Sequence, residues 1–126
     1  MHELALAQSI IEIGENEARK HGDARILKIK LLLGELTGVV REALEFSFEA
    51  ARFGTSAERA TLEIELVPLR ARCLKCGPVL EPQRDFCLLC PGCGDAVVIV
   101  SGREMQVEYV DLDSELREDA ACSVLT

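Results

Sequence analysis

The spacing of hydrophobic residues in the first half of the chain predicts two helices. Apolar residues recur at helical intervals between Leu4 and Lys20, and Gly22 is placed to end that helix. A second helix is predicted from Arg41 to Phe53, with Gly54 at its end. The face of the first helix that we expect to be buried comprises Leu6, Ala7, Ile10, Ile11, Gly14 and Ala18.

Alternation of apolar and polar residues predicts three strands, at residues 25–33, at residues 60–67 and after Gly102. Pro68 helps to end the second strand, because proline has no N–H for a strand ladder. The apolar residues expected on the core face are Leu27, Ile29, Leu31 and Leu33 in the first strand, Leu62, Ile64 and Leu66 in the second, and Met105, Val107 and Tyr109 in the third.

The order of these elements predicts an α+β fold in which a cysteine-rich insert interrupts a small domain. We expect a mixed three-stranded sheet with two helices, formed by residues 1–69 and 103–112, and an inserted lobe at residues 70–102. Residues 113–126 are polar, acidic and without a pattern, so we expect them to form a disordered tail. Cys122 lies in this tail, and we expect it to be a free, exposed thiol.

Length and composition fit one hydrophobic core with a small appendage. The chain has 126 residues, of which 48% are hydrophobic, enough for one core but not for two large domains. It contains no apolar run of 18 residues, and no basic residue precedes the apolar stretch that begins at Leu4. We therefore expect a soluble, cytoplasmic protein that contacts no membrane.

Five of the six cysteines lie between residues 73 and 93, and four of them form two matching pairs. The pairs are Cys73-Leu-Lys-Cys76-Gly and Cys90-Pro-Gly-Cys93-Gly. Two thiolates in this spacing can bind one tetrahedral ion in a tight turn, and the glycine after each pair suits the positive φ of such a turn. We therefore expect a zinc-ribbon-like, zinc-binding domain whose ligands are Cys73, Cys76, Cys90 and Cys93.

Cys87 leaves a second assignment open, because Cys87-Leu-Leu-Cys90 has the same spacing. Pro91 argues against this pair, since proline offers no N–H to a sulfur and cannot adopt a positive φ. We expect Cys87 to be a small apolar residue that packs beside the site.

Three other uses of these cysteines have less support. The spacing of Cys87, Cys90 and Cys93 is similar to the start of a bacterial ferredoxin motif, but no further cysteine follows three residues later. Disulfide bonds are disfavoured because no secretory segment is present. A mononuclear iron ion in the same four sulfurs would give the same sequence pattern.

The net charge of −8 argues against nucleic-acid binding. A zinc ribbon that binds nucleic acid needs a basic face to neutralise phosphates, whereas residues 73–102 carry two Lys or Arg and three Asp or Glu. Four thiolates on a divalent ion would add about −2 to this part of the chain. We therefore expect no nucleic-acid partner.

The first three residues, Met1-His2-Glu3, offer a compact group of metal ligands. A free α-amine, backbone amides, an imidazole and a carboxylate would lie close together, and Ni(II) and Cu(II) favour such nitrogen and oxygen sets. Alternatively, Glu3 complements the N-terminal charge of the first helix and His2 is a frayed end. The other histidine, His21, fits the last turn of that helix, where the helix dipole favours it.

The combination of these motifs resembles the HypA/HybF family of hydrogenase nickel-maturation proteins. The resemblance covers about residues 1–112: the Met-His-Glu-Leu start, the Lys-His-Gly end of the first helix, the CLKCG and CPGCG motifs, and the return strand at 101–105. It implies a metallochaperone that carries nickel towards [NiFe] hydrogenase together with a partner GTPase of HypB type. It also implies His2 as the key nickel ligand, with Met1 and Glu3 beside it, and a structural zinc on the four cysteines.

The expected function is therefore binding and delivery of nickel, not catalysis. The expected metals are transported Ni²⁺ and structural Zn²⁺. The expected partners are the GTPase and the hydrogenase large-subunit precursor, and a homodimer stays open. Two alternatives remain, a zinc-ribbon interaction module that transports no metal and a redox protein with iron in the cysteine site. Removal of His2 would separate the first from nickel delivery, and visible colour would indicate the second.

Overall fold

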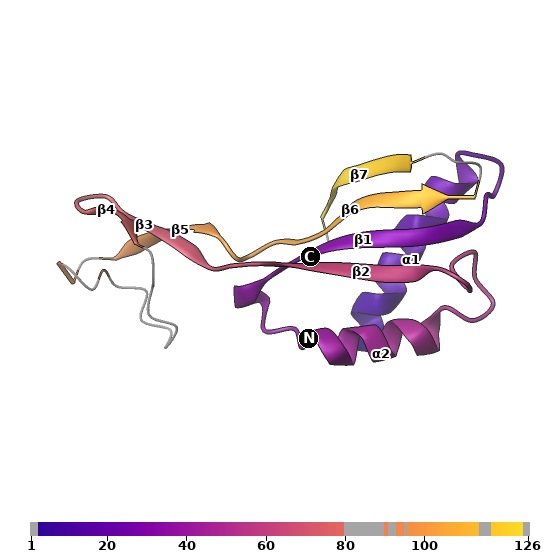
Figure 1. Cartoon of the computed structure of the whole chain (residues 1–126), viewed down its shortest axis with the longest axis horizontal. Coiled ribbons are helices and arrows are strands. Elements are labelled where there is room, and N and C mark those ends of the chain that lie inside the picture. Colours follow the sequence, from indigo (N-terminus) through magenta and orange to yellow (C-terminus); the bar gives the residue numbers. More distant parts are fainter. Residues whose placement is uncertain (1–2, 80–89, 91–92, 95, 114–116, 125–126) are drawn as a thin grey trace.

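The structure, a computed structural model, describes residues 3–79, 90, 93–94, 96–113 and 117–124. Figure 1 shows two unequal lobes that are joined end to end by two stretches of chain. The larger lobe contains a four-stranded sheet and two α-helices, and the smaller lobe contains a three-stranded sheet and the described cysteines of the two pairs. None of the described helices is long and apolar enough to cross a membrane.

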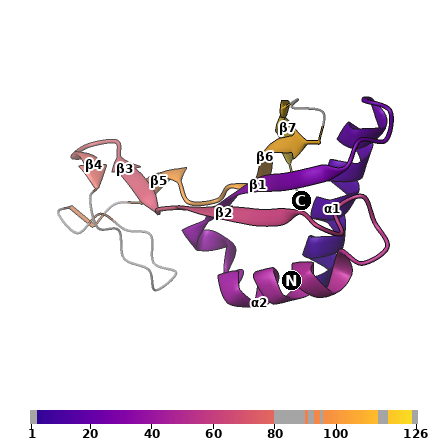
Figure 2. The same cartoon turned by 45° about the vertical axis from the view of Figure 1, so that its right-hand side comes forward.

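The larger lobe confirms the predicted α+β class, with a mixed sheet and two α-helices. The helices pack against each other and against the same sheet (Figure 2). The sheet order is β2-β1-β6-β7, in which β1 is parallel to β2 and antiparallel to β6, and β6 is antiparallel to β7. The elements are α1 (Glu3–Arg19), β1 (Ile26–Gly34), the 3-10 helix η1 (Glu35–Thr37), α2 (Arg41–Ala51), β2 (Thr61–Val67), β6 (Met105–Leu112) and β7 (Arg117–Val124).

The smaller lobe is built from the chain between β2 and β6. Its strands are β3 (Arg70–Cys73), β4 (Gly77–Val79) and β5 (Val97–Ser101), in the order β4-β3-β5, and both pairings are antiparallel. The predicted domain bounds stay a prediction, although no described strand runs through residues 68–69 or 102–104.

The buried face predicted for the first helix is confirmed. All six residues that were expected on the buried face of α1 are buried, and on α2 the buried residues are Leu44 and Phe48. Gly14 allows α1 to approach β1, since a Cβ at this position would lie 3.0 Å from Ile26 Cδ1 and 3.1 Å from Ile29 Cδ1. The core of the larger lobe is thus formed jointly by both helices and the sheet.

A bulge in β1 changes which residues of the first predicted strand face the core. The register with β6 shifts between Ile26 and Lys28, so Ile26 is buried and Leu27 is 47% exposed. The core position predicted for Leu27 is therefore wrong. Those predicted for Ile29, Leu31 and Leu33 are confirmed.

A second shift corrects the predicted face of β6. Lys30 pairs with Tyr109 and Leu31 with Val107, which leaves one extra residue between them on β6. This extra residue turns Tyr109 away from the core, because one inserted residue exchanges the two faces of a strand. Tyr109 is therefore a wrong core prediction, as is Leu66, which is 54% exposed at the end of edge strand β2.

The C-terminal segment is not a disordered tail throughout, because residues 117–124 form β7. This strand pairs with β6 from Gln106 to Asp111. Pairing with β7 satisfies the backbone N–H and C=O groups on the edge of β6. These hydrogen bonds form between backbone atoms, so they need no apolar alternation in the added strand. Cys122 falls in β7, and its predicted free thiol stays a prediction.

Paired charges lie beside β1 on the larger sheet. Lys28 Nζ is 2.9 Å from Glu63 Oε2, and Lys30 Nζ is 3.4 Å from Glu65 Oε1. Lys28 also lies over the ring of Tyr109, 5.5 Å from its centroid. The hydrogen bond from Lys28 lowers the pKa of Glu63, so this pairing favours the folded state above the acid range and is lost as the pH falls through that lowered pKa.

The two lobes meet where η1 contacts both connecting stretches of chain. The N–H of Gly34 donates to Glu104 O at 2.6 Å, and the N–H of Leu36 donates to Gly102 O at 2.7 Å. Across the other connection, the N–H of Leu69 donates to Glu35 Oε2 at 3.1 Å. These bonds fix the base of the smaller lobe to the end of β1.

Substitution of Gly34 is expected to weaken this junction strongly. A Cβ on Gly34 would overlap Gly102 O and lie 2.6 Å from Glu104 N, both of them backbone atoms that must move. Loss of the two Gly34 and Leu36 hydrogen bonds alone costs about 2 kcal/mol. We expect Gly34→Ala to lower the free energy of unfolding in urea by about 3 kcal/mol.

Gly54→Ala is the matched control. Gly34 has an extended backbone that any residue can adopt, whereas Gly54 has φ of +76°, which favours glycine. Apart from its chain neighbours, no atom lies within 4 Å of a Cβ added at Gly54. Its expected cost is about 1 kcal/mol, from the left-handed backbone alone. Equal losses of stability in the two variants would contradict the close approach of Gly34 to Gly102.

Candidate metal centre

The first cysteine pair lies in the hairpin between β3 and β4. Cys73 is the last residue of β3, and Gly77 begins β4 with φ of +86°. The positive φ predicted for the glycine after this pair is therefore present. The hairpin turns the chain so that Cys73 and Cys76 lie on the same side of it.

The second pair forms a similar turn outside the strands. The N–H of Gly94 donates to Cys90 O at 2.8 Å, and Gly94 has φ of +77°. This turn brings Cys90 and Cys93 to the first pair, although the two pairs are far apart in sequence. The local signal that predicted both turns was the glycine after each second cysteine.

The four cysteine sulfurs converge on one point. Their Sγ atoms all lie within 4.8 Å of one another, and Cys73 Sγ is 3.5 Å from Cys93 Sγ. A tetrahedral zinc ion with Zn–S bonds of about 2.3 Å has S···S edges of about 3.8 Å. A disulfide would need about 2.05 Å, and all four cysteines are free. The donor set therefore fits one tetrahedral ion.

The sulfurs occupy the interior of a lobe that has little else to bury. Cys73 and Cys90 are buried, and Cys76 and Cys93 are exposed. The only described residues that share this interior are Ala71, which is buried, and Val97, which is partly buried. Because so small an apolar cluster stabilises little on its own, the lobe depends on whatever holds the sulfurs together.

The environment of the sulfurs favours a bound cation. The backbone N–H groups of Cys76 and Lys75 donate hydrogen bonds to Cys73 and lower the pKa of its thiol to about 7. Interaction with the sulfurs of Cys93, Cys90 and Cys73 raises the pKa of Cys76 to about 12. Four thiolates so close together repel one another, so full ionisation requires a positive ion among them. Metal binding must therefore displace protons and weaken in acid.

Cys87 lies outside the described residues, so the alternative pair with Cys90 is neither supported nor contradicted. Its predicted position beside the site also stays a prediction. The sulfurs that lie together in the described structure are those of the predicted ligand set, which rests on the glycine that follows each pair. These residues are Cys73, Cys76, Cys90 and Cys93. Among the described residues, no other group of three or more His, Cys, Asp or Glu residues is close enough to hold a metal.

Of the three predicted nickel ligands, the structure describes only Glu3. Met1 and His2 lie outside the described residues, and Glu3 is the first residue of α1. His21 lies in the turn that follows α1, and its N–H donates to Ala18 O at 3.0 Å. The helix rises about 1.5 Å per residue, so its two ends are about 24 Å apart. His21 therefore cannot share an ion with Glu3 of the same chain.

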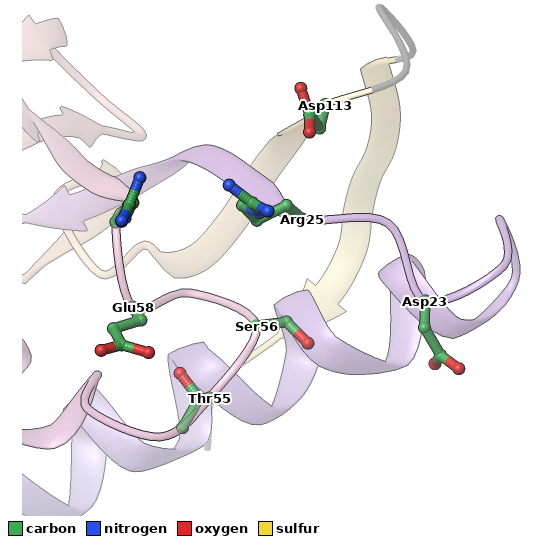
Figure 3. A pocket seen from close by; sticks show the side chains of 7 residues that line it. Asp23, Arg25, Thr55, Ser56, Glu58 and Asp113 are labelled. Carbon is green, nitrogen blue, oxygen red and sulfur yellow. The ribbon is translucent and has the colours of Figure 1, made fainter.

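A polar cavity of about 500 Å³ lies at the loops that connect each helix to the following strand (Figure 3). Sequence reasoning did not find it, because its walls come from three separate loops. It gathers acids, arginines and hydroxyl groups without a metal-ligand arrangement. The residues that line it are Asp23, Arg25, Thr55, Ser56, Glu58, Arg59 and Asp113.

Comparison with known proteins identifies the family. Residues 1–112 match the family model described as hydrogenase/urease nickel incorporation, metallochaperone, hypA. The chain is 43% identical over 122 residues to hydrogenase maturation factor HypA of Roseiflexus sp. (strain RS-1), covering 96% of this chain and 99% of that protein. It is also 43% identical over 114 residues to the HypA of Geobacter sulfurreducens, covering 90% and 100%.

Solved structures of similar proteins share the fold. A solution structure of HypA protein aligns with a TM-score of 0.67 at 25% identity, covering 91% of this chain and 98% of the other. The solution structure of the Ni metallochaperone HypA from Helicobacter pylori aligns with a TM-score of 0.63 at 23% identity, covering 89% and 97%. The resemblance found in the sequence motifs is thereby confirmed. The chain belongs to the HypA family of nickel metallochaperones for hydrogenase maturation, which are maturation factors and not enzymes.

Proposed function

We propose that this protein binds Ni(II) at its amino terminus and delivers it for the maturation of [NiFe] hydrogenase, while a structural zinc holds the four cysteines. The observation that carries this proposal is the family match over residues 1–112, which includes both the Met-His-Glu start and the cysteine pairs. The two sites differ in donor atoms, and this difference allows one chain to sort two metals.

The four-sulfur site suits a structural ion. Sulfur ligands in a tetrahedron favour zinc, and four protein ligands leave no position open for a substrate. Cys73 and Cys90 are buried within the lobe, so the ion would replace the apolar core that the lobe lacks. Nickel that reached this site would be held by groups that the lobe needs for its own stability.

The amino terminus suits a transported ion. The Met1 amine, the His2 imidazole and Glu3 provide nitrogen and oxygen donors, the set that Ni(II) favours. Glu3 begins α1, and α1 is anchored in the core by Leu6 and Ala7. The ligands would therefore stand at the end of a fixed helix, where a partner can approach and remove the ion.

Delivery requires partners that this chain does not contain. By the family's role, nickel passes from this protein to the hydrogenase large-subunit precursor with the help of a HypB-type GTPase, in the cytoplasm. We place the GTPase contact on the larger lobe near the amino terminus, because the ion must be transferred there. A contact at this point would be lost if the terminus were blocked or extended.

Changing any ligand cysteine to serine is expected to remove the zinc and unfold the smaller lobe. Structural zinc contributes on the order of 10 kcal/mol of apparent binding energy, most of which is folding energy for such a lobe. We expect Cys93→Ser to lose most of its metal on gel filtration, measured by elemental analysis, while the larger lobe keeps its circular dichroism. Cys87→Ser is the control and should retain one zinc per chain.

Retention of zinc by Cys93→Ser together with its loss from Cys87→Ser would show that Cys87 belongs to the ligand set. Coloured protein that contains iron in place of zinc would instead support the redox alternative.

In the cell, a strain that lacks this protein is expected to make hydrogenase subunits that contain no nickel and are inactive. Excess nickel in the medium should partly restore activity by mass action. The His2→Ala chain should behave like the deletion, and His21→Ala should complement it, because His21 is at the far end of α1. The measurements are hydrogenase activity and nickel content of the purified enzyme.

Full hydrogenase activity in the deletion strain at trace nickel, with no second copy of the gene, would contradict nickel delivery. Full complementation by His2→Ala would contradict the amino-terminal site and would favour an interaction module that transports no metal.

A further inference from the structure

The small sheet has one face towards the sulfurs and one face towards solvent. Ala71 and Cys73 point inward, and Arg70 and Arg72 alternate with them and are exposed. Arg72 pairs across the ladder with Val98, so these two side chains share the solvent face. We define the outer face of the smaller lobe as Arg70, Arg72, Val98 and Val100.

This outer face combines large apolar exposure with positive charge. Val98 is 53% exposed and Val100 is 63% exposed. Among the described residues, neither Arg70 nor Arg72 forms an ion pair. In the described part of the lobe, these two arginines therefore lie beside two exposed valines with no acidic partner, on a chain with a net charge of −8.

Charge is segregated between the two lobes. Residues 70–103 contain five Lys or Arg and three Asp or Glu, whereas residues 3–69 and 104–113 contain eight Lys or Arg and sixteen Asp or Glu. A divalent ion with four thiolates carries about −2, but its sulfurs lie with the inner face. The outer face therefore presents a local positive charge on an acidic protein.

The edge of this sheet is open to pairing. β5 is the last strand in the order β4-β3-β5, so one side of it has no partner strand among the described residues. Its sequence, Val-Val-Ile-Val-Ser, contains no charge and no proline, the two features that usually protect an edge strand. The register shift opposite Arg70 leaves Val100 outside the ladder pairs.

We propose that the outer face and the free edge of β5 dock an extended segment of a partner protein that carries both carboxylates and apolar side chains. The segment pairs with β5 as a fourth strand, its apolar side chains cover Val98 and Val100, and its carboxylates reach Arg70 and Arg72. This surface goes beyond the proposed function, because it concerns the smaller lobe and requires no nickel.

Charge decides between this occupant and two others. A second copy that paired β5 with β5 would bring two positive outer faces together over only five residues per strand. A nucleic acid needs more phosphate contacts than two arginines supply, and the negative charge of the thiolate site behind the sheet would repel its phosphates. An acidic segment matches the arginines, and alternate apolar residues match the valines.

The test uses amide NMR shifts of the full zinc-loaded chain with two synthetic peptides. Each has about eight residues, with threonine at every second position so that the remaining positions share one face of an extended strand. In the first peptide these positions alternate valine and glutamate, and in the second they alternate valine and lysine. We expect the glutamate peptide to shift the amides of β3 and β5 saturably and the lysine peptide to leave them unchanged.

Charge reversal at the outer face is expected to raise the dissociation constant of the glutamate peptide about tenfold. The variant is Arg70→Glu with Arg72→Glu, and its matched control is Arg25→Glu with Arg59→Glu, which makes the same charge change at the polar cavity of the larger lobe. If the reversed variant loses zinc, Arg70→Gln with Arg72→Gln replaces it and should still weaken binding. The control should bind like the unchanged chain.

Four results would overturn the proposal. The first is that the glutamate peptide does not shift the β5 amides, and the second is that the lysine peptide shifts them equally. The third is that the control variant weakens peptide binding as much as the charge-reversed variant does. The fourth is occupation of the outer face by something else, seen as larger shifts with a single-stranded oligonucleotide or as concentration-dependent shifts without any peptide.

Discussion

The crowding of four sulfurs within 4.8 Å is the constraint on which the smaller lobe depends. Such a group is unstable without a cation, because the thiolates repel one another and the protonated thiols bury little apolar surface. With a cation it becomes the centre of the lobe, since the described apolar cluster around it is only Ala71 and Val97. The two connections to the larger lobe lead to the paired strands β3 and β5 of this lobe, and they meet the larger lobe at the junction of Gly34 and Gly102.

Under the proposed function, the larger lobe supports a different kind of site. Its core is formed by both helices and the sheet, so α1 is packed against the rest of the lobe along its length. The position of its first residue, Glu3, is therefore fixed by the core. Because the core holds this helix without the ion, an exposed metal-binding terminus can lose its ion and the lobe keeps its folding stability. This separation allows one chain to keep one metal and give up another, provided that the two ions prefer different donors.

Features set by local chemistry could be predicted from the sequence, and features set by pairing could not. The positive φ of Gly77 and Gly94 follows from the turn that each cysteine pair requires, and the buried face of α1 follows from helical spacing. Leu27 and Tyr109 were assigned to the wrong face because the assignment continued a period of two through positions where a bulge interrupts it. Strand β7 was missed because its partner is the edge of β6, and edge pairing leaves no apolar signature in the added strand.

X-ray absorption of untagged protein loaded with one zinc and one nickel tests the central claim most directly. The account predicts four sulfur neighbours at about 2.3 Å around zinc and only nitrogen and oxygen neighbours around nickel. In His2→Ala the zinc spectrum should be unchanged and the nickel signal should be lost after gel filtration. Sulfur neighbours around nickel, or stoichiometric nickel retained by His2→Ala, would contradict the assignment of two metals to two separate sites.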